Sequence, residues 1–132
     1  MNHLKVKKIV INIFKNFKLK EAHAEISAEY LIKAELLGAP SHGLSRLKMY
    51  CERLNKKIIN PNPKIKIKKI SQSISHIDAN NSIGFVAADL GIKIAIKNAK
   101  KTGIGLVAIK NSGHYGLSSF YAEQAVKKNL MV

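Results

Sequence analysis

Apolar residues recur at helical spacing between residues 18 and 37, in a segment rich in Ala, Glu, Leu and Lys. Ala24, Ala28 and Leu31 fall on one face of a helix drawn through this segment, as expected for a helix that packs against a core. Gly38 fits a C-terminal cap, because glycine easily adopts the left-handed conformation in which many helices end. The pattern therefore predicts a first helix over 18–37.

A second helical pattern follows Pro40, which prevents direct continuation of the first helix. Ser41 can cap this second helix, since its hydroxyl can accept a backbone N–H of the first turn. Leu44 and Leu47 begin an apolar face that extends to about Lys56. We therefore predict a second helix from Ser41 to about Lys56.

The pattern changes from helical to alternating after the sequence NPNP at 60–63, which marks a break. In KIKIKKI, at 64–70, lysine alternates with isoleucine, as in a half-buried strand with one solvated face. The segment ISHID, at 74–78, alternates again and could pair with the first. Two neighbouring strands are therefore predicted.

A longer helical pattern and a short apolar run follow the turn signal DANNSIG at 78–84. Residues 82–101 carry an apolar stripe at helical spacing, and residues 104–110 are typical of a buried strand. The polar loop NSGHYG, at 111–116, then leads to a last helical pattern over 117–129.

The order helix, helix, two strands, helix, strand, helix predicts an α/β fold in which N-terminal helices precede a mixed sheet covered by helices. We expect two parts. Residues 1–60 form a helical segment that carries the motif Ser-His-Gly, and residues 61–132 form the start of an α/β domain.

The composition fits a globular chain, with 46% hydrophobic residues among 132. Lysine interrupts every apolar run before it reaches membrane-spanning length, so no membrane segment is expected. Lysines also break the N-terminal apolar segment, and no small-residue cleavage site follows, so no signal peptide is expected. The single cysteine, Cys51, cannot form an internal disulfide, which agrees with a cytoplasmic location.

The formal net charge of +15 first suggests a nucleic-acid-binding protein. However, the basic residues are 21 lysines and two arginines, whereas base readers and phosphate clamps favour arginine. The lysines are also spread along the chain instead of forming a dense run. A specific nucleic-acid partner is therefore not predicted, although weak binding to polyanions is expected.

A compact polar cluster lies in the stretch APSHGLSR at 39–46. His42, Arg46 and Tyr50 follow one another at four-residue intervals, so on one helix they would share a face. The arginine could hold a carboxylate through two parallel hydrogen bonds, and the histidine could give or take a proton near neutral pH. Such a set suits a small 2-oxo or 2-hydroxy acid. From spacing alone, however, we favour the simpler interpretation of an N-cap serine followed by surface polar residues.

The loop NSGHYG at 111–116 is the second polar cluster, and it directly follows the predicted strand 104–110. Many α/β folds place ligand sites in such loops, and the next helix can offer N–H groups to an anion. A flexible turn with a solvent-facing His114 explains the sequence equally well. The chain contains neither GxGxxG nor a Walker-type loop, and its histidines do not have metal-ligand spacing with the cysteine, so no metal site is predicted.

Taken in series, these motifs resemble those of the type-2 malate/L-lactate dehydrogenase family, which also includes ureidoglycolate and sulfolactate dehydrogenases. The matching stretches are SHGLSRLKMYCERLNKKIINPNPKIKI and IDANNSIGFVAADLGIKIAIKNAKKTGIGLVAIKNSGHYG. Their order and spacing agree with the family pattern across most of residues 24–130. The resemblance implies NAD(P)-dependent oxidation of 2-hydroxy acids, or the reverse reduction, on a nucleotide-binding domain that is not a standard Rossmann fold.

Carried over position by position, the resemblance implies that His42 is the acid/base histidine and that Ser41 is its relay. Arg46 would bind the substrate carboxylate, and Tyr50 would line the substrate pocket. His114 matches a histidine that is assigned to proton transfer in some members and to the cofactor site in others. The implied cofactor-binding residues are His114, Tyr115, Gly116, Leu117 and Ser118.

Family chains are much longer than 132 residues. The resemblance therefore implies an incomplete N-terminal portion that carries half of a site and does not turn over substrate alone. The partners it implies are a small 2-hydroxy or 2-oxo acid, a second copy in a homodimer, and a C-terminal half. The alternatives are a non-enzymatic partner-binding module and a small basic nucleic-acid-binding protein.

Overall fold

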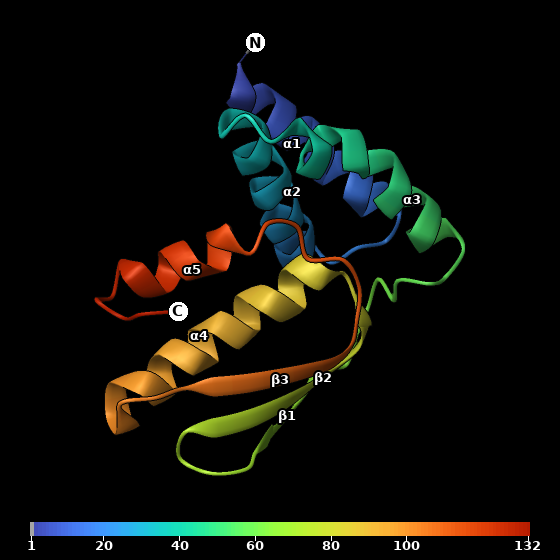
Figure 1. The fold of residues 1–132 in the computed structure, drawn as a ribbon. Helices are drawn as coiled ribbons and strands as arrows, with labels where there is room; N and C mark the ends of the chain where they lie inside the picture. The colour runs from blue at the N-terminus through green and yellow to red at the C-terminus, as the bar shows by residue number, and fades with distance from the viewer. Residues whose placement is uncertain (1) are drawn as a thin grey trace. The chain divides into compact units, whose positions relative to one another are not determined.

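The computed structural model describes residues 2–132, and the chain divides into two compact units, Met1–Asn62 and Pro63–Val132. The first unit contains three α-helices and two short 3-10 turns, and the second contains a three-stranded sheet with two α-helices (Figure 1). This mixed α/β architecture confirms the predicted fold class.

Helix α1 (His3–Asn16) is missing from the sequence-based prediction. The side-chain oxygen of Asn2 caps it by accepting two backbone N–H groups of the first turn. Val10 and Phe14 lie four residues apart on its buried face. Lysines on the remaining faces give the segment the pattern of a basic tail. The two buried apolar side chains nevertheless pack this helix into the core of the first unit.

Helix α2 (Glu21–Leu36) confirms the first predicted helix, and Gly38 follows it with a left-handed φ of 72°. The second predicted helix is wrong over its first residues, because two 3-10 turns precede α3 (Leu47–Asn55). Gly43 separates these turns with an extended ψ of −137°, so helical hydrogen bonding cannot run through it. Ser41 consequently caps no α-helix.

The core of the first unit is drawn from all three helices. Phe14 of α1 meets Tyr50 of α3 edge to face, with ring centroids 6.5 Å apart. The other buried apolar side chains of this unit include Val10, Leu19, Ala24, Ala28, Leu31, Ile32, Ala34, Leu54 and Ile59.

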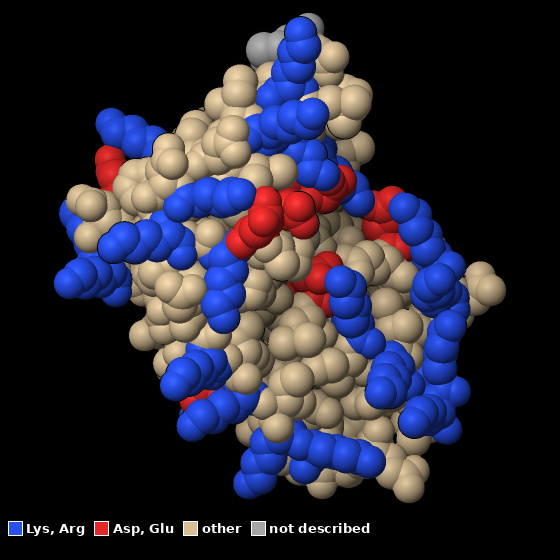
Figure 2. Space-filling model, turned by 180° about the vertical axis from the view of Figure 1, so that it is seen from behind, with Lys and Arg blue, Asp and Glu red and all other residues tan. Residues whose placement is uncertain are grey.

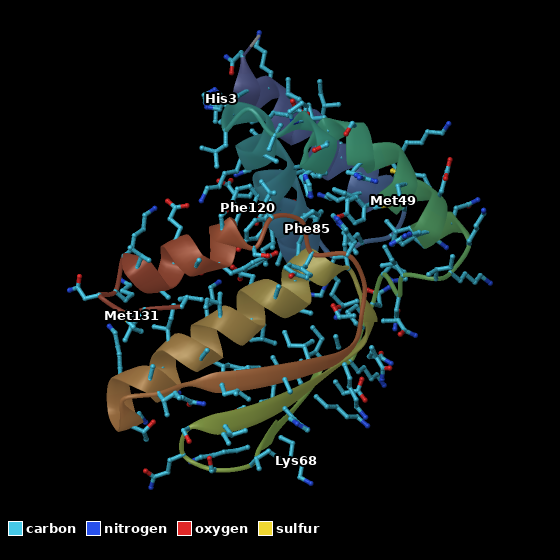
Figure 3. All side chains as sticks on the ribbon, in the orientation of Figure 1. His3, Met49, Lys68, Phe85, Phe120 and Met131 are labelled. Atoms are coloured by element: carbon cyan, nitrogen blue, oxygen red, sulfur yellow. The ribbon has the colours of Figure 1, made fainter. Side chains whose placement is uncertain are left out.

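The sheet of the second unit has the order β1-β2-β3. Strand β1 (Lys66–Lys69) runs antiparallel to β2 (Ile74–Ser82), and β2 runs parallel to β3 (Leu106–Ser112). The antiparallel pairing of β1 with β2 confirms the predicted strand pair. Lys68 points away from β1 into solvent (Figure 3). The expected half-buried face of this strand is wrong, because all four residues of β1 are exposed, including Ile67 at 54%.

Helix α4 (Gly84–Thr102) connects the two parallel strands and covers one face of the sheet (Figure 1). Ile77 and Ala79 of β2 pack against Ala87 of α4 to form a buried cluster, which Leu90, Ile94, Val107 and Ile109 extend. Helix α5 (Ser119–Val126) lies against α4, where Gln124 Nε2 donates to Asp89 Oδ1 at 3.3 Å.

One boundary and the burial of one strand differ from the prediction. The expected turn at 78–84 is instead the irregular end of β2, which accommodates Asn80 and Asn81 at φ 50° and 56° before it rejoins β3 at Ser82. Strand β3 was expected to be buried, but within the described residues it pairs with β2 alone, and Leu106 is 52% exposed. An apolar strand sequence signals burial, but it does not say which neighbours provide that burial.

Lysine and arginine side chains are scattered over the face in Figure 2 and do not gather in one dense patch. Among residues 2–132, no helix is both long and apolar enough to cross a membrane.

Candidate functional site

The Ser-His-Gly motif lies in the two 3-10 turns η1 (Pro40–His42) and η2 (Leu44–Arg46) of the first unit. Glu35, at the end of α2, fixes the junction between them, because its Oε1 accepts the backbone N–H of Leu44 at 2.7 Å. A Cβ at Gly43 would lie 2.5 Å from that same oxygen. A larger residue at this position would therefore have to displace the Glu35 carboxylate.

Ser41 and His42 are in direct contact at this junction. The Ser41 hydroxyl lies 3.1 Å from Nδ1 of His42, and the direction of the hydrogen bond depends on the tautomer of the ring. Arg46 donates from Nε to the carbonyl oxygen of Ser41 at 2.7 Å. The structure therefore brings Ser41, His42 and Arg46 together through 3-10 geometry and not on an α-helical face.

Tyr50 lies inside α3, with 1% of its surface exposed. Burial raises the pKa of its phenol far above the usual value, and the nearby charges of Arg53 and Arg46 offset only part of that rise. The expectation that Tyr50 shares a helical face with His42 is wrong, because the intervening backbone is not α-helical. The phenol stays protonated at physiological pH.

The second motif occupies the end of β3 and the loop before α5, in the second unit. Asn111 has φ 53°, and its Nδ2 donates to Asp78 Oδ1 of β2 at 2.9 Å. Nδ1 of His114 accepts the backbone N–H of Gly116 at 3.3 Å. That bond requires an unprotonated Nδ1, so the neutral ring carries its proton on Nε2.

The loop is also fastened on the side of α5. The Tyr121 hydroxyl donates to the carbonyl oxygen of Tyr115 at 2.5 Å, and the two rings lie 5.7 Å apart. The hydroxyls of Tyr115 and Ser118 are 3.3 Å apart. Leu117 is half-buried and opens the turn into α5 by accepting the N–H of Phe120. The predicted cofactor segment is thus an ordered loop and not a loose turn.

A cavity of about 450 Å³ lies beside this loop, between α4, β3 and α5. Its wall is largely apolar, formed by Gly91 and Ala95 of α4 and by Val107 of β3. The polar part of the wall comes from Ser112, Tyr115 and Tyr121. His114 itself does not line this cavity, although both of its neighbours do.

Sequence reasoning missed two residues that shape these motifs, Glu35 and Asp78. Glu35 falls at helical spacing after Leu31, and Asp78 lies in the expected turn at 78–84, so neither was predicted to have a functional role. For Asp78, a signal was present in the alternating pattern, which places it on the sheet face opposite Ile77. Within residues 2–132, no group of three or more His, Cys, Asp or Glu side chains could hold a metal ion.

The family model for malate/L-lactate dehydrogenase matches residues 1–132. The chain belongs to this family. It is 37% identical over 125 residues to the L-sulfolactate dehydrogenase of Methanocaldococcus jannaschii, a match that covers 95% of this chain and 36% of that protein. It is 36% identical over 109 residues to the ureidoglycolate dehydrogenase (NAD(+)) of Escherichia coli K12, covering 83% of this chain and 31% of that protein.

The fold also agrees with a solved member of the family. The structure of malate dehydrogenase from Pyrococcus horikoshii OT3 superposes with a TM-score of 0.92 at 34% identity, and the match covers 96% of this chain and 36% of that one. The resemblance inferred from the motifs is therefore confirmed. This dehydrogenase-family chain spans about a third of the length of the relatives it matches.

Proposed function

We propose that residues 1–132 provide the acid/base histidine, the carboxylate-binding arginine and part of the cofactor site of an NAD(P)-dependent dehydrogenase of small 2-hydroxy acids. The observation that supports this most directly is the 3.1 Å contact between Ser41 and His42, in a turn fastened by Glu35. Malate, sulfolactate and ureidoglycolate, the substrates in the relatives' names, all carry a hydroxyl beside a carboxylate.

In this proposal the histidine moves a proton while the substrate carbon changes oxidation state. NAD(P), when bound, supplies the hydride acceptor for oxidation or the hydride donor for reduction. His42 takes the proton of the substrate hydroxyl during oxidation and returns it during reduction. Ser41 holds Nδ1 of the ring and, being exposed, passes a proton between that nitrogen and solvent.

Arg46 binds the substrate carboxylate. Its Nε is already engaged by the carbonyl oxygen of Ser41, which fixes the guanidinium plane next to the histidine. A planar, fixed guanidinium can hold a carboxylate in one orientation and so present the hydroxyl-bearing carbon to His42. Tyr50 is retained as the family's substrate-pocket tyrosine, and its ring is buried against Phe14 in the core of the first unit.

The cofactor contacts are proposed for His114, Tyr115, Gly116, Leu117 and Ser118. The neighbouring cavity supports this assignment, since its volume of about 450 Å³ lies within the usual range for ligand pockets. Its largely apolar wall, with Ser112, Tyr115 and Tyr121 as its polar residues, suits one planar ring with polar substituents. The family resemblance further leads us to propose NAD or NADP as the cofactor, a homodimer, and a cytoplasmic location.

The test is a chimera in which residues 1–132 replace the matched segment of the Pyrococcus horikoshii malate dehydrogenase. We expect it to oxidise at least one of malate, sulfolactate and ureidoglycolate with NAD or NADP. Because the chain matches only about a third of its relatives, we expect residues 1–132 alone to show no turnover.

Two variants locate the chemistry within the chimera. His42→Asn should lower kcat by about 100-fold or more, as for loss of a general base. His76→Asn, an exposed histidine on β2, serves as the matched control and should leave kcat unchanged. A folded chimera that binds NADH yet turns over none of the three acids would refute the proposal.

A further inference from the structure

Asp78 and Asn111 join the ends of the two parallel strands on the sheet face opposite α4. Asn111 Nδ2 donates to Asp78 Oδ1 at 2.9 Å, and the same oxygen accepts the backbone N–H of Asn80 at 3.1 Å. Lys110 lies 3.4 Å from the other carboxylate oxygen. The carboxylate therefore binds both strands at the point where their regular pairing is interrupted.

The bond to Asn111 fixes the direction in which the chain leaves β3. Asn111 adopts φ 53°, a left-handed conformation that asparagine tolerates better than most residues. Its side chain is held by Asp78 in that conformation, so the backbone turns at a defined angle into Ser112 and Gly113. The hydrogen bond from Asn111, followed by that from Asn80, lowers the pKa of the Asp78 carboxyl, so the acceptor is charged at neutral pH.

The first turn of α4 restricts the backbone position of Gly113 and His114, the next part of the loop. A Cβ at Gly84 would collide with the carbonyl oxygens of Gly113 and His114, so these peptides lie directly on the helix start. Phe85, labelled in Figure 3 at this turn, lies under Gly116, where an added Cβ would be 2.7 Å from its ring. The His114 backbone is thus confined on one side by α4.

With Tyr121 holding Tyr115 from α5, the loop has three attachments: β2, the start of α4, and α5. The first of them acts on the segment before His114 through the side-chain hydrogen bond of Asn111. The result of this confinement is the hydrogen bond from the Gly116 N–H to His114 Nδ1, which selects the tautomer of the ring.

We propose that Asp78 is a positioning residue for His114, acting through Asn111. This inference rests on the proposed function, because only that function assigns His114 to the cofactor site. It assigns a role to the IDANNSIG segment, whose carboxylate lies on β2 and is not part of the NSGHYG loop. Asp78 itself does not contact the substrate or the cofactor in this proposal.

The experiment follows the Gly116 amide by NMR hydrogen exchange in residues 1–132, without ligand. Asp78→Ala should speed exchange at Gly116 by about tenfold, the effect of losing one net hydrogen bond, while amides in the middle of β2 and β3 keep their protection. Asp78→Asn should preserve slow exchange, because its amide oxygen can still accept from Asn111 and Asn80. The histidine ¹⁵N shifts should show a loss of the Nε2–H tautomer preference in Asp78→Ala and not in Asp78→Asn.

Asn111→Gly provides a second route that keeps the left-handed backbone accessible and removes only the side-chain donor. It should reproduce the effect of Asp78→Ala even if the latter unfolds. Asn129→Gly makes the same replacement at another left-handed asparagine, outside this loop, and should change nothing at Gly116. Unchanged exchange and unchanged ¹⁵N shifts in Asn111→Gly would overturn the inference.

The outcome is independent of catalysis. NADH titration of the chimera tests the proposed function, whereas the amide and ¹⁵N readouts test only whether Asp78 orients His114. If the chimera binds NADH normally while these readouts do not move in the variants, the positioning role fails and the proposed function stands. If the readouts move as expected and the chimera fails to bind NADH, the proposed cofactor site fails and the positioning role stands.

Discussion

Glu35 accepts the backbone N–H of Leu44 at 2.7 Å, and this single hydrogen bond ties the end of α2 to the start of η2, directly after the turn that carries Ser41 and His42. The carboxylate occupies the space that any side chain at Gly43 would need. A surface glutamate of a helix thus determines the backbone conformation of the proposed acid/base motif.

Replacing Glu35 should therefore loosen this turn. We expect Glu35→Ala to lower the free energy of unfolding of the first unit by about 1–2 kcal/mol, the typical value for a lost hydrogen bond to a charged group that is partly exposed. Glu35→Gln should recover most of this loss, because its amide oxygen can accept the same N–H. Urea unfolding measures both, with Glu25→Ala, an exposed glutamate of α2, as the control. Equal losses in the alanine and glutamine variants would contradict this account.

Gly84 and Gly113 offer a matched pair for the second motif. Gly84→Ala should destabilise the second unit by about 1–3 kcal/mol, since its methyl group would collide with backbone oxygens that cannot easily move. An added Cβ at Gly113 meets no atom within 4 Å, so Gly113→Ala should have little effect. Thermal unfolding should therefore give a lower melting temperature for Gly84→Ala than for Gly113→Ala. Similar melting temperatures would show that the loop moves to accommodate the methyl group.

The buried phenol of Tyr50 predicts a specific alkaline instability. Its pKa is raised in the folded state, so folding favours the neutral phenol. This contribution is fully present below the unfolded-state pKa of about 10 and is lost as the pH rises above it, because the unfolded chain then gains by ionising. Stability curves of the wild type and Tyr50→Phe, measured from pH 7 to pH 11, should therefore converge or cross on the alkaline side. A constant difference over that range would mean that the phenol ionises equally in both states.

The sequence predicted which helices and strands form better than it predicted which other elements pack against them. Helices α2 and α4 each carry a long helical pattern, the β1–β2 pair carries two short alternating ones, and all of these elements are present. Helix α1 was missed, because only Val10 and Phe14 are buried on it and its lysines obscure the pattern. The strand at 104–110 was expected to be buried, yet exposure depends on neighbouring elements, which a local pattern does not contain.

The same limit applies to the candidate site. His42, Arg46 and His114 could be selected from motifs, because residue type and order along the chain are enough for that. The roles of Glu35 and Asp78 could not, because each depends on a contact between segments that are 9 and 33 residues apart. The error at Ser41 has a local cause: Gly43 interrupts the helix through its extended backbone, and helical spacing assumes an uninterrupted one.

Arg46 gives the sharpest test of substrate binding in the chimera. Its Nε is held by the carbonyl oxygen of Ser41, so the terminal nitrogens are the part of the fork that a carboxylate can approach. Lysine has one nitrogen and cannot make both contacts, so Arg46→Lys should raise KM for the hydroxy acid by about tenfold or more, with a smaller change in kcat. Arg53→Lys changes the neighbouring arginine in the same way and should leave KM unaltered. A fall in kcat at constant KM would instead place Arg46 in the proton-transfer step, because binding of the carboxylate would then be intact.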